Sequence, residues 1–376
     1  MKIVMLSKAL VSGAYQKKLE ELARLPEVDL LALVPPAWHE PRVGTIRLDR
    51  RFTQGYRLEV LPILFNGRHH LHFYPGLRQV LQRERPDLLH IDEESFNPAT
   101  FLALRAGRAV GARCCFYNYA NNDRYYPPPF NLFERYAFRH AAYALVCNQE
   151  AAQIIRRHGY AGPLAVLPQF GVDPELFHPA DKQRTLTNDF IVGYVGRLVP
   201  EKGVLDLVEA LVELPAHVRL RLVGAGALRP QIERRVAELG LRGRVELRPA
   251  VASTDVPATL RELDALVLPS HTMPNWKEQF GRILIEAMSS GVPVVGSSSG
   301  EIPNVIGDAG LVFPEGDITA LRACLDRLLH DAALWQRLRE QGRNRVLAHY
   351  TQAALARRYY AIYREMLTAA STRHPR

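Results

Sequence analysis

The strongest constraint on the fold is an alternation between short apolar runs and amphipathic segments, which fills both halves of the 376-residue sequence. The apolar runs have the length of buried strands, and the amphipathic segments have the period of helices that cover a sheet. This order is typical of βα units, in which crossover helices join parallel strands. We therefore predict an α/β protein with two Rossmann-like, doubly wound parallel sheets.

The first series of elements begins at the N-terminus. Its predicted strands are Lys2–Leu6, Asp29–Val34, Arg57–Leu61, Asp87–Ile91, Arg113–Tyr117, Ala144–Cys147 and Leu164–Val166. Its predicted helices are Tyr15–Arg24, Tyr74–Arg85, Pro98–Gly107, Leu132–Arg139 and Gln149–His158. The polar stretch Pro179–Asp189 lacks periodicity and is the expected linker.

The second series follows that linker. Its predicted strands are Phe190–Val195, Arg219–Val223, Arg244–Leu247, Ala265–Leu268 and Val292–Gly296. Its predicted helices are Val204–Leu214, Leu228–Leu239, Arg282–Ser289, Ile318–Leu329, Ala333–His349 and Gln352–Thr368. We expect domains at 1–180 and 181–350, a terminal helical segment at 351–376, and ligands in a central cleft that the two sheets face.

Composition narrows the class of protein. Hydrophobic residues make up 47% and charged residues 23% of the chain, which is ordinary for a globular protein. The four cysteines have neither metal-ligand nor redox spacing, and no apolar run approaches the length of a membrane span. We expect a cytoplasmic protein, with peripheral contact to the inner membrane face as an open alternative. The net charge of +9 leaves three interpretations open, namely binding of phosphate-bearing ligands, contact with an anionic membrane, or a surface that is merely rich in arginine. The sequence has no nucleic-acid-binding motif.

A pair of glutamates flanks the start of one predicted helix. Glu278 lies just before Gly281, which opens the helix Arg282–Ser289, and Glu286 lies within it. The backbone N–H groups at such a helix start are free to bind a diphosphate. Eight residues of helix would separate the two carboxylates by about 12 Å, the span from the sugar to the ribose of a nucleotide sugar. Each carboxylate accepts hydrogen bonds from a vicinal diol. The alternative is a solvated Glu beside an ordinary helix.

Two cations follow the first strand of the second half. Gly196 permits a sharp turn after the strand Phe190–Val195, and Arg197 and Lys202 come next. Two such cations can neutralise a departing nucleoside diphosphate without a metal ion. The alternative is a pair of surface cations in a turn.

These motifs resemble those of retaining glycosyltransferases of the GT-B fold, in family 4. The match includes the two glutamates, the two cations, and the stretch from Gly291 to Gly296. The resemblance implies that Glu278 contacts the donor sugar, Glu286 contacts the ribose, and Arg197 with Lys202 holds the diphosphate. It also implies that the stretch containing Gln279, Phe280 and Gly281 binds the donor, and that the final helix packs on the first domain.

The implied reaction moves a hexose-type sugar from a nucleoside diphosphate sugar to an acceptor hydroxyl, with retention at the anomeric carbon and without a metal or other cofactor. The acceptor class is open between a glycan, a lipid and a small molecule. Two rival functions are a non-catalytic module that binds nucleotide sugars and another nucleotide-sugar enzyme, such as an epimerase.

The first half supplies fewer candidates. Gly13 follows the first strand, where the family has a glycine-rich turn at the donor phosphates. Asp92-Glu93-Glu94 follows a buried strand, and Glu94 is a candidate for binding or deprotonating the acceptor, with a solvated loop as the alternative. Asn121 is a second candidate, either for a sugar hydroxyl or for capping a turn. His69, His70 and His72 are expected to be loop residues rather than metal ligands.

Overall fold

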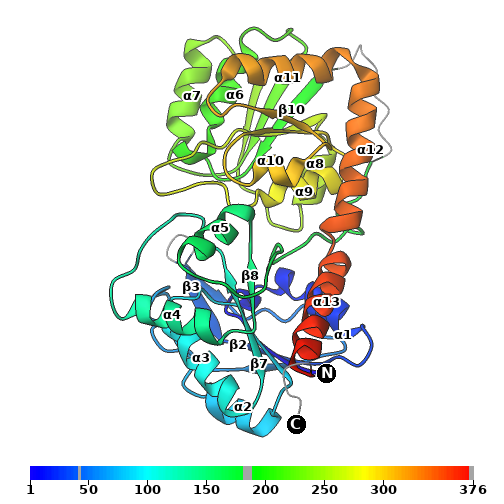
Figure 1. Ribbon diagram of the computed structural model, residues 1–376. Helices are drawn as coiled ribbons and strands as arrows, with labels where there is room; N and C mark the ends of the chain where they lie inside the picture. The colour runs from blue at the N-terminus through cyan, green and yellow to red at the C-terminus, as the bar shows by residue number, and fades with distance from the viewer. Residues whose placement is uncertain (41–43, 181–188, 372–376) are drawn as a thin grey trace. The chain divides into compact units, whose positions relative to one another are not determined.

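The computed structural model describes residues 1–40, 44–180 and 189–371 and divides into two compact units. Unit 1 comprises Met1–Gly171 and Gln352–Arg376, and unit 2 comprises Val172–Thr351. Most of the predicted linker, Pro179–Asp189, lies outside the described residues. Figure 1 traces the chain from unit 1 into unit 2 and back into unit 1.

A seven-stranded parallel sheet forms the centre of unit 1. Its strands are β1 (Lys2–Leu6), β2 (Asp29–Val34), β5 (Arg57–Val60), β6 (Leu88–Ile91), β7 (Arg113–Asn118), β8 (Tyr143–Val146) and β9 (Leu164–Val166). Their order across the sheet is β5-β2-β1-β6-β7-β8-β9. The direction of winding reverses between β1 and β6, and ligands of such sheets bind beyond the carboxyl ends of the strands at this reversal.

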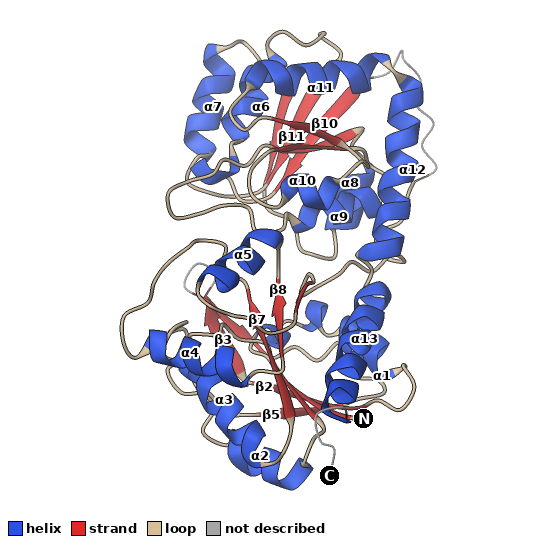
Figure 2. Cartoon of the chain, in the orientation of Figure 1, coloured by secondary structure: helices blue, strands red, loops and turns tan. Residues whose placement is uncertain are grey.

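Helices cover both faces of this sheet. They are α1 (Lys17–Ala23), α2 (Leu77–Glu84), α3 (Pro98–Ala109), α4 (Phe130–His140), α5 (Gln149–Arg157) and α13 (Gln352–Ser371). Figure 2 shows α1 and α13 together on one face and α2, α3 and α4 on the other. The Tyr363 hydroxyl of α13 lies 2.7 Å from His90 Nδ1 on β6, so α13 belongs to the core of unit 1.

Unit 2 repeats the same architecture with six parallel strands. They are β10 (Phe190–Val195), β11 (Val218–Val223), β12 (Val245–Arg248), β13 (Ala265–Leu268), β14 (Val294–Ser297) and β15 (Leu311–Phe313). Their order is β12-β11-β10-β13-β14-β15, so the winding reverses between β10 and β13.

The helices of unit 2 also form two layers. They are α6 (Val204–Leu211), α7 (Arg229–Glu238), α8 (Val256–Arg261), α9 (Arg282–Ser289), α10 (Ile302–Ile306), α11 (Ile318–His330) and α12 (Ala332–His349). In Figure 1, α6, α7 and α11 cover one face of the sheet, while α8, α9, α10 and α12 cover the other.

The predicted α/β class with two Rossmann-like sheets is confirmed. Five short strands and α-helices were not predicted, namely the strands β3 (Ala37–Glu40) and β4 (Gly44–Arg47) of an antiparallel hairpin, the helices α8 and α10, and the strand β15. Each is shorter than the window in which a period can be recognised. None of the helices in the described ranges is long and apolar enough to cross a membrane.

Candidate active site

The reversal point of the unit 2 sheet carries a cavity of about 370 Å³. The turn after β10 and the segment between β13 and α9 form most of its wall. The lining residues are Tyr194, Val195, Gly196, Arg197, Lys202, Val256, Leu268, Glu278, Gly281, Arg282, Ile283 and Glu286. Four residues predicted from separate motifs, Arg197, Lys202, Glu278 and Glu286, therefore line one cavity at the position expected for a ligand.

Close backbone packing shapes the turn after β10. A Cβ atom on Gly224 would lie 1.8 Å from the Gly196 carbonyl oxygen, and one on Gly226 would lie 2.1 Å from the Leu198 carbonyl oxygen. The Tyr194 hydroxyl donates a hydrogen bond to the Arg197 carbonyl oxygen over 2.7 Å. The backbone of Arg197 is therefore held in place. The turn can pack this closely because Gly224 and Gly226 of the neighbouring βα turn have no side chains.

Lys202 and Glu278 form an ion pair across the cavity wall. Lys202 Nζ lies 2.5 Å from Glu278 Oε2, and the two side chains are only 15% and 10% exposed. The Ser270 hydroxyl donates to the same Glu278 oxygen over 2.9 Å, and Lys202 Nζ lies 4.7 Å from the centre of the Trp276 ring. Glu278 Oε2 therefore has two partners, Lys202 and Ser270. The Lys202–Glu278 pair places a cation next to a hydrogen-bond acceptor in the cavity wall.

The first turn of α9 lines the same cavity. Gly281 precedes the helix in the left-handed region, with a φ of 76°, and no side chain caps the first turn. The first N–H groups of α9 have no partners within the helix, and its dipole favours negative charge there. An anionic group in the cavity would meet these N–H groups together with Arg197 and Lys202.

Glu286 sits in α9 and faces the same cavity. Its carboxylate forms an ion pair with Arg282, whose Nε lies 2.9 Å away. Burial raises the pKa of the Glu286 carboxyl, although Arg282 opposes this shift. The helix α9 begins at Arg282, as predicted, and Glu278 lies in the irregular segment before it, so the helical rise does not describe the whole path between the two carboxylates. The two carboxylates nevertheless line one cavity.

Arg197 lines the cavity, and its side chain is 45% exposed and contacts Glu201 over 3.5 Å. Two other residues of the predicted donor-binding stretch lie outside the cavity wall. Gln279 is exposed, and Phe280 packs against Tyr350, with 5.7 Å between the ring centres. Neither Gln279 nor Phe280 is among the described residues that line the cavity.

Three residues of this site went unrecognised in the sequence. Ser270 and Trp276 contact the Lys202–Glu278 pair, and Arg282 pairs with Glu286. Arg282 is four residues before Glu286, so the helical spacing was a signal for it. Nothing in the sequence pattern pointed to Ser270 or Trp276, whose contacts depend on the path of the irregular segment.

Gly13 follows β1 in unit 1 and starts a short 3-10 helix, Gly13–Tyr15. It is buried, and a Cβ atom there would lie 2.6 Å from Arg51 Cγ and 2.8 Å from Asp49 Oδ2. The absence of a side chain therefore lets the Asp49–Arg51 segment pack over this turn. A role at the donor phosphates stays a prediction.

Asp92 and Glu93 do not form a solvated loop, so that alternative is wrong for them. Asp92 Oδ2 accepts hydrogen bonds from Ser7 and Gln169, each over 2.5 Å, and burial raises the pKa of Asp92. Glu93 is buried with Lys8 and with His72, whose Nε2 lies 3.1 Å away. Burial alone would raise the pKa of Glu93, but these two partners lower it to about 2.

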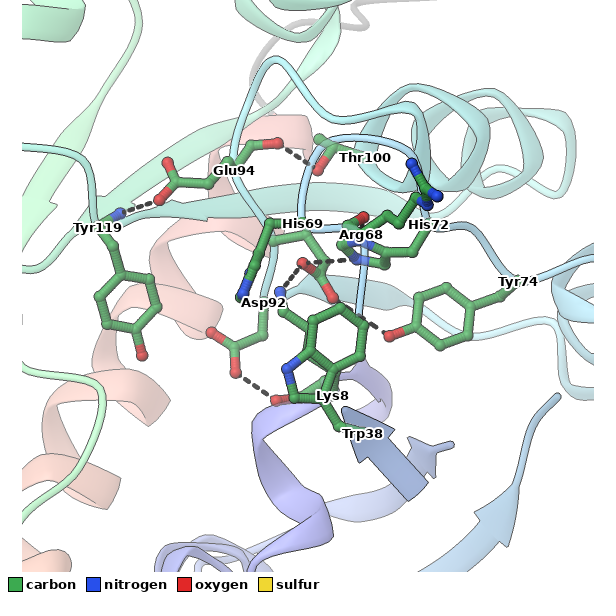
Figure 3. Close-up of polar contacts among 12 residues, drawn as sticks. Lys8, Trp38, Arg68, His69, His72, Tyr74, Asp92, Glu94, Thr100 and Tyr119 are labelled. Atoms are coloured by element: carbon green, nitrogen blue, oxygen red, sulfur yellow. Dashed lines mark hydrogen bonds and ion pairs between the residues drawn. The ribbon is translucent and has the colours of Figure 1, made fainter. Parts of the chain in front are cut away.

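His72 lies in the loop between β5 and α2, as expected, but its side chain is buried and contacts Glu93. Its ring is 0% exposed and lies 5.1 Å from the ring of Trp38 on β3. Figure 3 shows Lys8, His72 and Tyr74 around one side of the acidic segment, while the Glu94 carboxylate points away toward the Tyr119 backbone. The acidic segment therefore divides into a buried ion-pair cluster and a separate carboxylate at Glu94.

Glu94 is held by the loop after β7. Its Oε1 accepts hydrogen bonds from the backbone N–H groups of Tyr119 and Ala120, over 3.0 and 3.2 Å. Its Oε2 is buried and has no hydrogen-bond partner, and the same is true of Nδ2 of Asn121. Burial raises the pKa of Glu94 to about 7, although the two backbone donors oppose this shift. A turn cap by Asn121, which would use its side-chain oxygen, stays a prediction.

The described residues contain no candidate metal site. No group of three or more His, Cys, Asp or Glu residues among them is arranged to hold a metal ion. The four cysteines are buried and unpaired with one another.

The family comparisons match both units. The profile described as "Glycosyl transferases group 1" covers residues 179–345, and the profile described as "Glycosyl transferase 4-like domain" covers residues 16–169. D-inositol 3-phosphate glycosyltransferase of Mycobacterium marinum is 30% identical over 229 residues, which are 57% of this chain and 48% of that protein. Alpha-D-kanosaminyltransferase of Streptomyces kanamyceticus is 28% identical over 258 residues, 65% of this chain and 66% of that protein. The chain thus spans about half of the first relative's length and about two thirds of the second's.

Solved structures show the same fold. The crystal structure of Anabaena HepE in complex with UDP superposes with a TM-score of 0.71 at 18% identity, covering 97% of this chain and 100% of that one. The two doubly wound parallel sheets and this structural likeness show the GT-B fold. Residues 179–345 belong to the glycosyl transferases group 1 family, and residues 16–169 match the glycosyl transferase 4-like domain.

Proposed function

We propose that the protein is a retaining glycosyltransferase that moves a hexose-type sugar from a nucleoside diphosphate sugar to an acceptor hydroxyl. The observation that carries this proposal is that one cavity in unit 2 is lined by Arg197, Lys202, Glu278, Gly281 and Glu286. It combines cations and a helix N-terminus for a diphosphate with carboxylates for hydroxyl groups at two points.

Each group has a distinct task in the proposed reaction. Arg197, Lys202 and the N–H groups after Gly281 hold the diphosphate and stabilise its charge as the bond to the anomeric carbon breaks. Glu286 accepts hydrogen bonds from the ribose diol, and Glu278 accepts them from the sugar. The acceptor oxygen bonds to the anomeric carbon on the face that the phosphate leaves, and a phosphate oxygen takes the acceptor proton. These cations remove the need for a metal ion.

Several relatives support this reading. The two curated relatives are a glycosyltransferase acting on D-inositol 3-phosphate and an alpha-D-kanosaminyltransferase, and HepE was crystallised with UDP. UDP-sugars are therefore the first donors to test, followed by GDP- and ADP-sugars.

A thermal-shift panel of UDP-, GDP- and ADP-sugars tests the donor site. We expect one nucleotide class to stabilise the protein with EDTA present, and Glu286→Ala to lose that stabilisation. Arg229→Ala is the matched control, because Arg229 pairs with Glu233 on the surface of α7. Full donor binding by Glu286→Ala would contradict the site assignment.

Product analysis separates the proposed transfer from its rivals. A non-catalytic module would bind a nucleotide yet release none from any donor, and an epimerase would return an altered nucleotide sugar. NMR of the product with the best donor should instead show a glycoside with the donor's anomeric configuration. An inverted configuration would contradict retention.

The surface formed by α3 and α4 has features that suit contact with a membrane. The adjacent helices α3 and α4 expose four arginines, and their only carboxylate, Glu134, is buried. The exposed arginines are Arg105, Arg108, Arg135 and Arg139. Leu102 and Leu132 are exposed on the same helices, at 38% and 54%. We propose that this α3–α4 face contacts anionic lipid headgroups.

Vesicle sedimentation at low salt tests this contact. Two arginines near a charged bilayer contribute about 2 kcal/mol, so Arg105→Ala with Arg139→Ala should weaken binding to phosphatidylglycerol vesicles about 25-fold. Phosphatidylcholine vesicles and an Arg229→Ala protein are the controls. Equal binding by the double variant and the unaltered protein would exclude this face.

A further inference from the structure

Seven buried side-chain polar atoms in the described part of unit 1 have no hydrogen-bond partner, and two of them belong to residues that backbone contacts join. Glu94 Oε2 is an acceptor, and Asn121 Nδ2 is a donor. Glu94 Oε1 binds the N–H groups of Tyr119 and Ala120, so Asn121 follows directly after the backbone that holds Glu94. Asn121 is only 3% exposed. Folded proteins rarely leave such atoms unpaired, so each needs a partner such as a water molecule or a ligand hydroxyl.

A stacked aromatic pair, of which Phe96 is buried, lies in the same part of unit 1. Phe96, two residues after Glu94, stacks on Tyr126 with 3.9 Å between the ring centres. His70 lies 5.4 Å from the ring of Phe96 and 6.1 Å from that of Tyr126. A sugar or cyclitol ring pairs apolar C–H faces with hydroxyl edges. Aromatic rings together with a free donor and a free acceptor suit that chemistry.

The loop that carries Asn121 and Tyr126 is fixed at its base. The His158 ring is 2.9 Å from Asp123 Oδ1 through Nε2 and 3.2 Å from Glu134 Oε2 through Nδ1. Arg157 also contacts Asp123, over 2.8 Å. The loop is therefore tied to α4 and α5, so Asn121 is positioned before any ligand binds.

We propose that Glu94, Asn121 and the Phe96–Tyr126 pair form a binding site for a polyhydroxylated six-membered ring, the acceptor of the proposed transfer. Glu94 Oε2 accepts a hydrogen bond from one ring hydroxyl, and Asn121 Nδ2 donates one to a neighbouring oxygen. This inference rests on the proposed function for the ligand's role as acceptor, but the binding itself does not depend on the donor site.

The pH dependence follows from the surroundings of Glu94. Its pKa of about 7 means that it is protonated at pH 6 and ionised at pH 8. The charged or titratable side chains that act on it are Lys8, Glu93 and Tyr126. The pKa of Glu93 is about 2 and that of Tyr126 is raised, so neither changes charge in this range. A hydrogen bond to an ionised carboxylate is the stronger one, which predicts about fivefold tighter binding at pH 8 than at pH 6.

Saturation-transfer NMR with myo-inositol, methyl α-glucopyranoside and methyl α-mannopyranoside tests the site. We expect at least one of these rings to bind the unaltered protein, more tightly at pH 8. Glu94→Gln should remove the pH dependence, and Asn121→Ala should weaken binding about tenfold or more, since it leaves a ligand oxygen unpaired. Glu59→Gln, which changes an exposed carboxylate of β5, is the matched control and should bind as the unaltered protein does.

Absence of binding by all three rings, or equal binding by Glu94→Gln at both pH values, would overturn this inference. Thermal shifts with UDP, GDP and ADP on the same samples keep the two proposals apart. A normal shift with one nucleotide and failed ring binding removes the unit 1 site alone. The absence of a shift with all three nucleotides in the unaltered protein removes the proposed function instead.

Discussion

Replacing Lys202 with methionine removes one charge from the donor cavity and keeps the length of the side chain. Lys202 Nζ lies 2.5 Å from Glu278 and 4.7 Å from the centre of the Trp276 ring, so an uncharged stem should still pack there. Hydrogen bonds to charged groups contribute about 1.5–3 kcal/mol, which corresponds to about 10- to 140-fold in affinity. The variant also leaves Glu278 without its cation, and this bare carboxylate repels a diphosphate. We therefore expect donor affinity to fall toward the upper part of that range.

Isothermal titration with UDP and with the best UDP-sugar measures this change. Lys202→Met should weaken both ligands by a similar factor, because the diphosphate is common to them. Lys202→Arg should recover part of the loss, since it restores the charge, and Arg229→Met should bind normally. A Kd for Lys202→Met within twofold of the unaltered protein, at unchanged stability, would refute the assignment of Lys202 to the diphosphate.

Three further predictions concern other parts of the chain. Because burial raises the pKa of Glu286, donor affinity should fall as the pH drops through that raised value, and Glu286→Gln should abolish this dependence in titrations across pH 5–8. Tyr363→Phe leaves a buried histidine nitrogen on β6 unpaired, so urea denaturation should show unit 1 destabilised by about 1–3 kcal/mol. Gly224→Ala places a Cβ 1.8 Å from the Gly196 carbonyl oxygen, so it should lower the thermal stability of unit 2. Gly243→Ala, which has open space around the added carbon, should not.

The fold followed from the sequence wherever a strand is buried on both faces. β1, β2 and β10 begin and end at the predicted residues, because a continuous apolar run bounded by polar residues has few other structures in an α/β chain. The hairpin of β3 and β4 has one buried residue in β3 and none in β4, so it left no such signal.

The candidate site residues also divide into those that a sequence pattern predicts and those that it does not. Arg197, Lys202, Glu278 and Glu286 could be selected because their motifs end strands or begin helices, and parallel strands place such ends together. The ion pair between Lys202 and Glu278, 76 residues apart, depends on the path of an irregular segment that no pattern describes. The burial of Asp92 and Glu93 depends on Lys8, His72 and Gln169, which are brought in from distant loops.

A crystal structure of the protein with UDP tests the central claim most directly. We predict that the diphosphate lies in the unit 2 cavity, in contact with Arg197, Lys202 and the backbone N–H groups after Gly281, with the ribose at Glu286. A diphosphate bound elsewhere on the protein, or held by none of these groups, would contradict the account.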